Sequence, residues 1–267
     1  MRRAQLAELE DQQWLPQLLR DCITDLLRAV EEPAASLSPI HDHLRRLLEA
    51  GQTDVFVDLC SGSGGPMLVL RRAIEIDTGQ PVRLILTDKY PNLPAFEAAS
   101  ALEADRVSYR TAAVDARSVP PDLSGARTLF NALHHFRPDA ARAILADAAR
   151  SRTPIGAFDG TDRTLPSLLA IVVSPLMVLL GTPFLRPFRI SRIVLTYVIP
   201  VIPVLALWDG LVSCFRSYSP GELQELVKEI AAEGWTWEIG RVPFRRTPWY
   251  LTYVLGYPTR DDENLKG

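Results

Sequence analysis

The residues best placed to do chemistry gather at a glycine-rich turn that follows a short apolar run. Residues 55–66 read Val-Phe-Val-Asp-Leu-Cys-Ser-Gly-Ser-Gly-Gly-Pro, a pattern typical of a buried strand that delivers a nucleotide-like ligand to a helix N-terminus. Gly62, Gly64 and Gly65 can adopt positive φ and let backbone N–H groups approach a ligand closely. Asp58 ends the strand, where it can accept hydrogen bonds from a cationic or hydroxyl-bearing cofactor.

The same stretch resembles motif I of the class I S-adenosylmethionine-dependent methyltransferases, whose pattern is acid-x-Gly-x-Gly-x-Gly. Asp58, Gly62 and Gly64 keep that spacing, and Cys60 stands in place of the first glycine. The resemblance implies S-adenosylmethionine as the cofactor, held by Asp58, Cys60, Ser61, Gly62, Gly64 and Gly65. A nicotinamide or flavin turn is the main competitor, but its third glycine would fall at Met67. A purely structural turn is the other alternative.

Further acids and amides stand at the ends of later predicted strands, where ligands of open α/β sheets bind. Asp88 lies where the family places an acid for the two ribose hydroxyls, and a carboxylate can accept two hydrogen bonds at once. Asp115 and Ala116 resemble the pair that meets the adenine. Asn131 ends the next strand and joins this predicted cofactor site. For Asp88 and Asp115 an ordinary solvated loop is the competing interpretation.

Two adjacent histidines, His134 and His135, follow Asn131 where the family has its fourth motif, beside the transferred methyl group. An imidazole can take up a proton near neutral pH, which would suit methylation of a hydroxyl or thiol. Either histidine is therefore a candidate catalytic base, although both could simply pack and form hydrogen bonds. We expect no metal site here, because adjacent side chains point in different directions and no further His or Cys lies nearby in sequence.

The order of the predicted elements indicates the fold class. Helices are expected over 3–31, with a break at Pro16, and over 38–50, 67–76, 92–104, 138–150 and 221–233, the last capped by Ser219. Strands are expected over 54–59, 82–86, 106–114, 126–132, 154–158, 235–242 and 249–257. This alternation predicts an α/β, Rossmann-like and mainly parallel sheet. The final helix and two strands resemble the hairpin that closes a class I methyltransferase sheet with an antiparallel last strand.

Length and composition limit the class of protein. The 267 residues carry a net charge of −3, which argues against binding to nucleic acid. Three scattered cysteines fit a reducing cytoplasm, and no secretory signal is apparent at the N-terminus. We predict an N-terminal helical cap over 1–52, a core over 53–163 and 209–260, and an apolar helical insertion over 164–208.

The insertion carries unusually little charge. Between Arg163 and Asp209 the only charged residues are Arg186, Arg189 and Arg192. As a straight helix, residues 164–185 would extend about 33 Å, which is about the thickness of a hydrocarbon core. A transmembrane hairpin would place the three arginines on the outer side, against the positive-inside tendency. We therefore expect a hairpin on the cytoplasmic leaflet with its arginines near lipid phosphates; a lid over the active site or a dimer contact is the alternative.

An insertion at this point of the fold lies over the substrate pocket. The predicted substrate-side residues are Trp14, Asp159, Asp209, Arg216 and Tyr218; for the last three, a cluster that merely anchors the insertion is the alternative. The hypothesis is an S-adenosylmethionine-dependent methyltransferase of an apolar or membrane-soluble small molecule. The protein would be cytoplasmic and peripheral on the inner face of the cell membrane. The alternative from another class is a non-catalytic S-adenosylmethionine-binding or membrane-associated interaction module. The acceptor atom and the oligomeric state do not follow from the sequence.

Overall fold

A computed structural model of the chain describes residues 1–36, 40–186, 188–230, 232–243 and 250–259. Its centre is a seven-stranded sheet in the order β3-β2-β1-β4-β5-β7-β6. The strands are β1 (Val55–Asp58), β2 (Arg83–Leu86), β3 (Val107–Tyr109), β4 (Ala126–Phe130), β5 (Ile155–Asp159), β6 (Trp235–Pro243) and β7 (Tyr250–Pro258). The first five strands are parallel, and β7 pairs antiparallel with both β5 and β6. The predicted fold class is confirmed.

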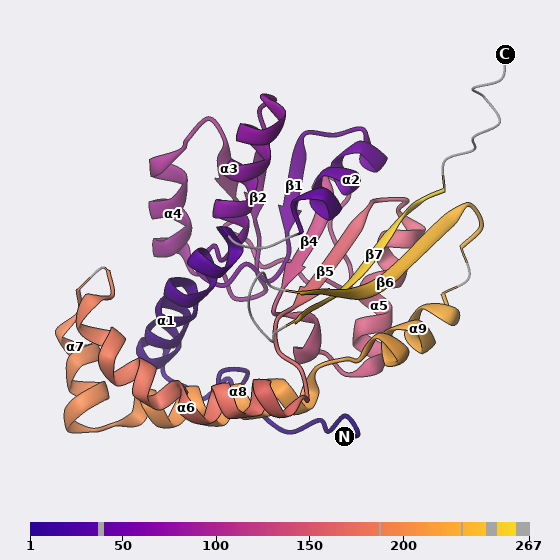
Figure 1. Cartoon of the computed structure of the whole chain (residues 1–267). Coiled ribbons are helices and arrows are strands. Elements are labelled where there is room, and N and C mark those ends of the chain that lie inside the picture. The colour runs from indigo at the N-terminus through magenta and orange to yellow at the C-terminus, as the bar shows by residue number, and fades with distance from the viewer. Residues whose placement is uncertain (37–39, 187, 231, 244–249, 260–267) are drawn as a thin grey trace, which may run out of the picture.

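Helices cover both faces of this sheet (Figure 1). α2 (His41–Gly51), α3 (Met67–Thr78) and α4 (Leu93–Leu102) pack with Phe56 of β1 in one apolar core. α5 (Pro138–Arg150) and α9 (Pro220–Lys228) pack with Val57 in the other. Both side chains are fully buried, as expected for a central parallel strand. The carboxyl ends of β1, β4 and β5 therefore meet at one edge, where the predicted site residues lie.

The N-terminal region differs from the prediction. Residues 1–8 have no regular structure, residues 9–15 form turns, and only α1 (Gln17–Ser36) is helical. The predicted helix before Pro16 is wrong because distant partners take its backbone groups. The N–H groups of Leu9 and Glu10 donate to the Asp209 carboxylate at 2.7 and 3.0 Å. We call residues 3–11 the N-terminal strap.

The insertion folds as a broken helical hairpin below the carboxyl edge of the sheet (Figure 1). It comprises α6 (Leu165–Gly181), the 3₁₀ turn η2 (Thr182–Phe184), α7 (Ile190–Ile193), the π-helical turn η3 (Val194–Val198) and α8 (Val201–Arg216), so that its last helix runs on past residue 208. We call residues 165–208 the apolar hairpin. It shares a separate small core with α1, formed by Leu15, Cys22, Ile23, Val178, Ile202 and Leu205.

Two of the three hairpin arginines turn towards α1 and not outward. Arg192 is 2% exposed and forms an ion pair with Asp25 of α1, which is also buried. Arg189 is half-buried and lies 3.7 Å from the carboxylates of Asp21 and Asp25. Arg186 is exposed. The prediction that all three arginines lie near lipid phosphates is therefore wrong for the buried Arg192, because Asp25 of α1 attracts it, and it stays a prediction for Arg186 and Arg189.

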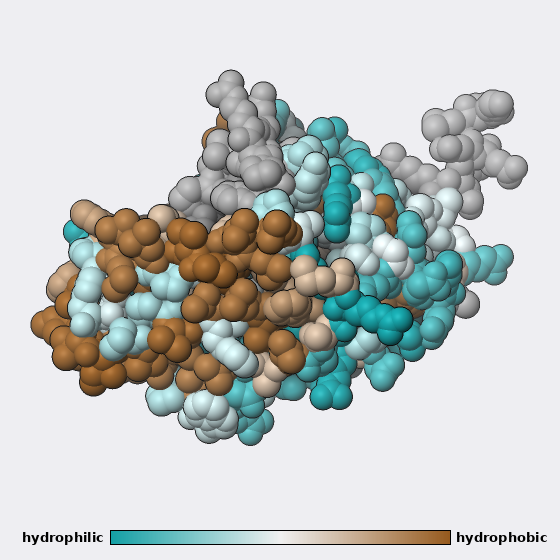
Figure 2. Space-filling model, turned by 60° about the horizontal axis from the view of Figure 1, so that its bottom comes forward, coloured by the Kyte–Doolittle hydropathy of each residue, from teal (hydrophilic) through white to brown (hydrophobic). Residues whose placement is uncertain are grey.

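The outer surface of the apolar hairpin is open. Figure 2 shows a broad hydrophobic surface over it, beside a hydrophilic surface over the rest of that view. By length and composition α6 together with η2 could cross a membrane. Only 17% of its most apolar stretch is buried inside the protein, so most of that stretch is exposed. The segments Ile190–Val198 and Val201–Arg216 would count as a second span only together, although they meet at a bend of 79°. Large apolar side chains at least half exposed here are Leu165, Leu169, Val172, Leu176, Met177, Leu180, Phe184, Phe188, Ile190, Val198, Ile199 and Val204.

Candidate functional site

The glycine turn after β1 has a left-handed backbone at several positions. φ is 59° at Cys60, 55° at Gly62, 102° at Gly64 and 45° at Gly65. Cys60 therefore adopts the conformation of the glycine it replaces in the motif, and such non-glycine residues concentrate at functional sites. A side chain at Gly64 would also lie 2.9 Å from Leu68. The turn thus needs these residue types for its shape.

Neighbouring strands hold the start of the turn. The buried Asp58 carboxylate accepts a 2.7 Å hydrogen bond from the Thr128 hydroxyl of β4. Its backbone carbonyl accepts hydrogen bonds from the amide and hydroxyl of Thr87, just after β2. Ser61 donates through its hydroxyl to the same carbonyl and through its amide to Thr87. The acid and the turn are therefore rigidly placed at the carboxyl edge of the sheet.

Asp88 and Asp115 lie beside this turn. Asp88 follows β2 as predicted, but the strand predicted over 106–114 ends at Tyr109, so Asp115 stands in the loop after β3 and not at a strand end. Asp88 is half-buried and accepts a 3.0 Å hydrogen bond from the amide of Gly62. A two-point hydrogen-bonded ion pair with Arg117 lowers the pKa of Asp115 to about 2. Asp115 and the buried Ala116 line a cleft of about 280 Å³ with Cys60, Lys89, Arg117, His135, Phe136, Arg137 and Ala140. This cleft is large enough to receive part of a small molecule next to the turn.

The Cys60 thiol in this cleft is not poised as a nucleophile. Burial, and then the negative charges of Asp88 and Asp58, raise the pKa of Cys60 well above its ordinary value. The thiolate is the reactive form of cysteine. Cys60 therefore contributes shape and contact surface to the cleft.

The ends of β4 and β5 join through polar side chains. Asn131, at φ 46°, accepts a 2.8 Å hydrogen bond from the amide of Gly160. The buried His134 lies with Nδ1 2.9 Å from the Asp159 carboxylate. This contact leaves Nε2 directed away from Asp159, at 3.9 Å from Glu8. His134 and Asp159 thus have the arrangement of an oriented base and the carboxylate that orients it.

His135 has a different environment. Its Nδ1 lies 2.7 Å from Glu8 and 2.9 Å from Asp11, both in the N-terminal strap. Burial disfavours the imidazolium, but the charges of Glu8 and Asp11 outweigh that effect and raise the pKa of His135 well above its ordinary value. A protonated imidazole has no lone pair for a substrate proton. Of the two predicted candidates, His135 is therefore the less suited to act as a base, and His134 is the one oriented by a carboxylate.

The substrate-side residues from the end of the insertion hold the strap and the histidine turn. Asp209 receives the strap amides, and Arg216 Nη1 lies 2.6 Å from Asp11 and 3.3 Å from Glu8. The Tyr218 hydroxyl donates to the Phe136 carbonyl at 2.8 Å. Trp14 is 68% exposed and does not join this group. The structure thus gathers Asp159, Asp209, Arg216 and Tyr218 around the histidines.

Glu8 and Asp11 are the site residues that sequence reasoning missed. Glu8 is 1% exposed, and Ser213 donates to it at 2.9 Å. His135 outweighs the effect of burial and lowers the pKa of Glu8, and His135 and Arg216 together lower that of Asp11 to about 2 despite its burial. Nothing local marks these acids, since Leu6, Leu9 and Trp14 around them have the spacing of an amphipathic surface helix.

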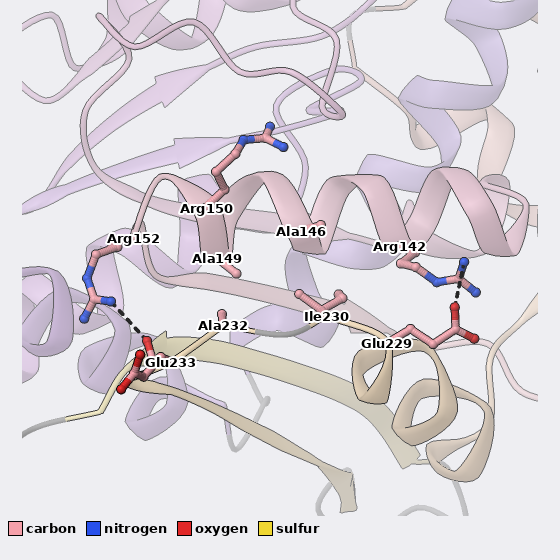
Figure 3. Close-up of a pocket in the computed structure, with 9 residues that line it drawn as sticks. All are labelled: Arg142, Ala146, Ala149, Arg150, Arg152, Glu229, Ile230, Ala232 and Glu233. Atoms are coloured by element: carbon pink, nitrogen blue, oxygen red, sulfur yellow. Dashed lines mark hydrogen bonds and ion pairs between the residues drawn. The ribbon is translucent and has the colours of Figure 1, made fainter.

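A second pocket, shown in Figure 3, lies away from this edge, between α5 and the segment from α9 to β6. Its volume is about 630 Å³. Two of its arginines are already engaged: Arg142 lies 3.0 Å from Glu229, and Arg152 donates to the Glu233 carbonyl at 3.3 Å. None of the predicted site residues lines it, so we do not assign it to the site.

Comparisons with known proteins yield structures and no sequence relatives. Neither the family models nor the curated proteins match the chain. Human N-acetylserotonin methyltransferase in complex with S-adenosylmethionine is 10% identical, with a TM-score of 0.50 over 89% of this chain and 56% of that chain. NcsB1, an O-methyltransferase from neocarzinostatin biosynthesis solved with S-adenosylmethionine and 2-hydroxy-5-methyl naphthoic acid, is 14% identical, with a TM-score of 0.46 over 82% and 55%.

LepI in complex with S-adenosylmethionine is 17% identical, with a TM-score of 0.45 over 76% of this chain and 42% of that chain. The chain thus spans about half the length of these structures. The likeness to N-acetylserotonin methyltransferase concerns the arrangement of the sheet and its helices. Together with the strand order and the antiparallel β7, it gives this chain the fold of the class I S-adenosylmethionine-dependent methyltransferases.

Proposed function

We propose that the protein is an S-adenosylmethionine-dependent methyltransferase that acts on an apolar small molecule at the inner face of the cytoplasmic membrane. The observation that carries the chemistry is the left-handed glycine turn between Asp58 and α3, with Asp88 and Asp115 beside it at the carboxyl edge of the sheet. These donors and acceptors suit a nucleoside that carries hydroxyl groups and a positive charge.

The residues present fit this cofactor. When bound, S-adenosylmethionine supplies a methyl group already activated by its sulfonium. Asp88, whose carboxylate now accepts from Gly62, can accept from the ribose hydroxyls. Asp58 supplies negative charge near the positive end of the cofactor. The protein must then mainly align the acceptor and exclude water, while His134, oriented by Asp159, can take the proton from an acceptor hydroxyl or thiol.

Calorimetry tests the cofactor. Wild-type protein should bind S-adenosylmethionine and S-adenosylhomocysteine, and Asp88→Ala should weaken binding by about 1–3 kcal/mol, or roughly 5- to 150-fold. Asp54→Ala is the matched control, because Asp54 is an ion-paired carboxylate just before the amino end of β1, at the opposite edge. A preference for NADH, or equal losses in both variants, would contradict the assignment.

The exposed apolar hairpin supports a lipid surface as its environment. A lid closed over the site would bury its apolar residues, but little of α6 is buried. A spanning hairpin would take α1 into the bilayer with it, since Arg192 and Asp25 join the two. α1 carries several further charges, and charged side chains at the bilayer centre are costly. A hairpin inserted into one leaflet leaves α1 outside the hydrocarbon and covers the apolar face.

Vesicle flotation tests the membrane. The double variant Leu176→Asp/Leu180→Asp changes two side chains more than half exposed on the apolar hairpin and should reduce vesicle binding at least about tenfold. Ile76→Asp/Leu102→Asp is the matched control, because both side chains are equally apolar and at least 78% exposed but lie on α3 and α4. The proposal would be contradicted by wild-type protein that does not float with vesicles. It would also be contradicted by a wild-type dimer that only the hairpin variant dissociates.

Product formation tests catalysis. A lipid extract incubated with the protein and S-adenosylmethionine radiolabelled in its methyl group should yield a labelled apolar product. His134→Gln should slow its formation more than it weakens cofactor binding, because His134 is assigned to the acceptor. Tight cofactor binding without any product would favour the non-catalytic binding module.

A further inference from the structure

The cluster that joins the N-terminal strap to the histidine turn has the donor set of a metal centre. One ligand atom each from Glu8, His134 and His135 lie within 4.8 Å of one another. Asp11 Oδ1 lies 2.9 Å from the same His135 nitrogen. Glu8 and His134 are almost fully buried. Two imidazoles and two carboxylates are ligands typical of divalent first-row transition metals.

Adjacent histidines can serve one site here, against the expectation from sequence. The turn that carries them is the 3₁₀ segment η1 (Leu133–His135), and it brings the two rings together. Their centroids are 4.4 Å apart and their planes differ by 31°. Successive side chains of an extended strand would point to opposite faces. The premise that excluded a metal was therefore wrong, because it ignored this turn.

The surroundings orient His134 as metal ligands are usually oriented. Its Nδ1 contacts the buried Asp159 carboxylate at 2.9 Å. A carboxylate in that place fixes the ring and leaves the other nitrogen for the metal. That other nitrogen, Nε2, lies 3.9 Å from Glu8 Oε1, so a small approach of the two side chains would let one ion contact both at about 2.0–2.2 Å.

Arg216 is the group that would oppose a cation, because it shares both acids with the histidines. Its Nη1 contacts Asp11 Oδ2 and Glu8 Oε2. The imidazoles face Asp11 Oδ1, Glu8 Oε1 and, at 2.7 Å from His135 Nδ1, the same Glu8 Oε2. Arg216 is further anchored by the backbone carbonyls of both histidines. Three carboxylates, those of Glu8, Asp11 and Asp159, lie against the two imidazoles, and the Arg216 guanidinium contacts two of them, so acidic ligands outnumber this cation.

We propose that a divalent transition-metal ion binds Glu8, His134 and His135, with Asp11 as a fourth ligand, and clamps the N-terminal strap onto η1. The ion joins two parts of the chain more than a hundred residues apart, and so it should order the strap over the candidate site. This goes beyond the proposed function and does not depend on cofactor binding, but an ion on Nε2 of His134 would take the nitrogen that the proposed function assigns to the acceptor proton.

Cobalt(II) is a suitable probe because its visible absorption reports coordination. Tag-free protein, treated with EDTA and desalted, should bind one equivalent of Co²⁺ and develop this absorption. Mg²⁺ should not stabilise the protein against unfolding. Glu8→Gln and His134→Asn should each weaken Co²⁺ binding at least about tenfold. His41→Asn is the matched control and should bind as wild type does, because His41 lies 3.7 Å from Asp77 and outside the cluster. Equal Co²⁺ binding by all variants would overturn the proposal.

A second measurement needs no variant. Trypsin should cleave the wild-type chain after Arg3 more slowly with Co²⁺ than with Mg²⁺, because the clamp holds residues 3–11 against η1. Unchanged cleavage at saturating Co²⁺ would refute the clamp. Calorimetry with S-adenosylhomocysteine, carried out in EDTA, separates the two proposals. Protein that binds S-adenosylhomocysteine there but does not bind Co²⁺ in the absorption experiment contradicts only the metal site. Protein that binds Co²⁺ but not S-adenosylhomocysteine contradicts only the proposed function.

Discussion

Asp25→Asn should strongly destabilise the protein, because it removes the buried carboxylate charge that the Arg192 guanidinium contacts. Arg192 is 2% exposed and Asp25 7%, so water cannot replace the lost partner. Removal of one member of such a buried pair typically costs about 3–5 kcal/mol. At this chain length each kcal/mol lowers the melting temperature by about 2–4 °C. The variant should therefore melt roughly 6–20 °C below the wild type.

Arg189 adds only slightly to this loss. It lies 3.7 Å from the same carboxylate and is 33% exposed, so its charge is screened by solvent. The double variant Asp25→Leu/Arg192→Met removes both charges, and it should recover most of the stability because apolar replacements of buried ion pairs are often neutral or stabilising.

Thermal melts and denaturant titrations of three variants complete the test. Arg186→Gln is the control, since Arg186 is an exposed arginine of the same hairpin; its melting temperature should stay within about 2 °C of the wild type. If Asp25→Asn melts like this control, Arg192 does not lie against α1. The sequence-based expectation that the arginines face lipid phosphates would then be restored.

Three further predictions concern the cofactor edge. Gly64→Ala should weaken binding of S-adenosylhomocysteine, measured by calorimetry, at least about tenfold, because φ of Gly64 is 102°. Gly79→Ala, at the open end of α3, is the control: it should cost only about 1 kcal/mol of stability and leave the affinity unchanged. Cys60 should react with iodoacetamide at pH 8 more slowly than a free cysteine, as read by mass spectrometry, because its pKa is raised; fast labelling would contradict this. Because the pKa of Asp115 is lowered to about 2, its stabilising effect is complete above about pH 4 and is lost as the pH falls through about 2. The ratio of wild-type to Asp115→Asn affinities for S-adenosylhomocysteine should therefore be the same at pH 8 and pH 5.

The sheet and the glycine turn could be predicted because their signals are local. Alternation of apolar runs with amphipathic segments follows from burial on two faces, and the capping box of α9 between Ser219 and Glu222 lies within four residues. All seven strands predicted along the chain are present, although β3 is shorter than predicted, and the structure adds that Cys60 has the backbone of a glycine. Binding of the cofactor to Asp58 and Asp88 stays a prediction.

The strap could not be predicted because its partners are far away in sequence. The hydrogen bond from Leu9 to Asp209 joins residues 200 positions apart. Such contacts override the helical spacing of the first residues, since a backbone N–H bonded to a buried carboxylate is unavailable to a helix. The prediction that Arg192 points towards lipid phosphates is wrong for the same reason, because its partner Asp25 is far away in sequence. A sequence shows that a charge is present, but a single helical turn, α7, decides which way it points.

α8 connects the two features that the proposed function combines. Its outer side belongs to the apolar hairpin, where Trp208 is half exposed while its indole N–H donates to the Ala7 carbonyl of the strap at 3.0 Å. Over the next two turns, Asp209, Ser213 and Arg216 hold the strap and the histidine turn. One continuous helix thus presents apolar surface at one end and polar anchors of the candidate site at the other. Helices move as stiff units, so a lipid surface that fixes the apolar hairpin would also fix Asp209, Ser213 and Arg216. The candidate site would then be ordered only at the membrane, where an apolar acceptor is dissolved.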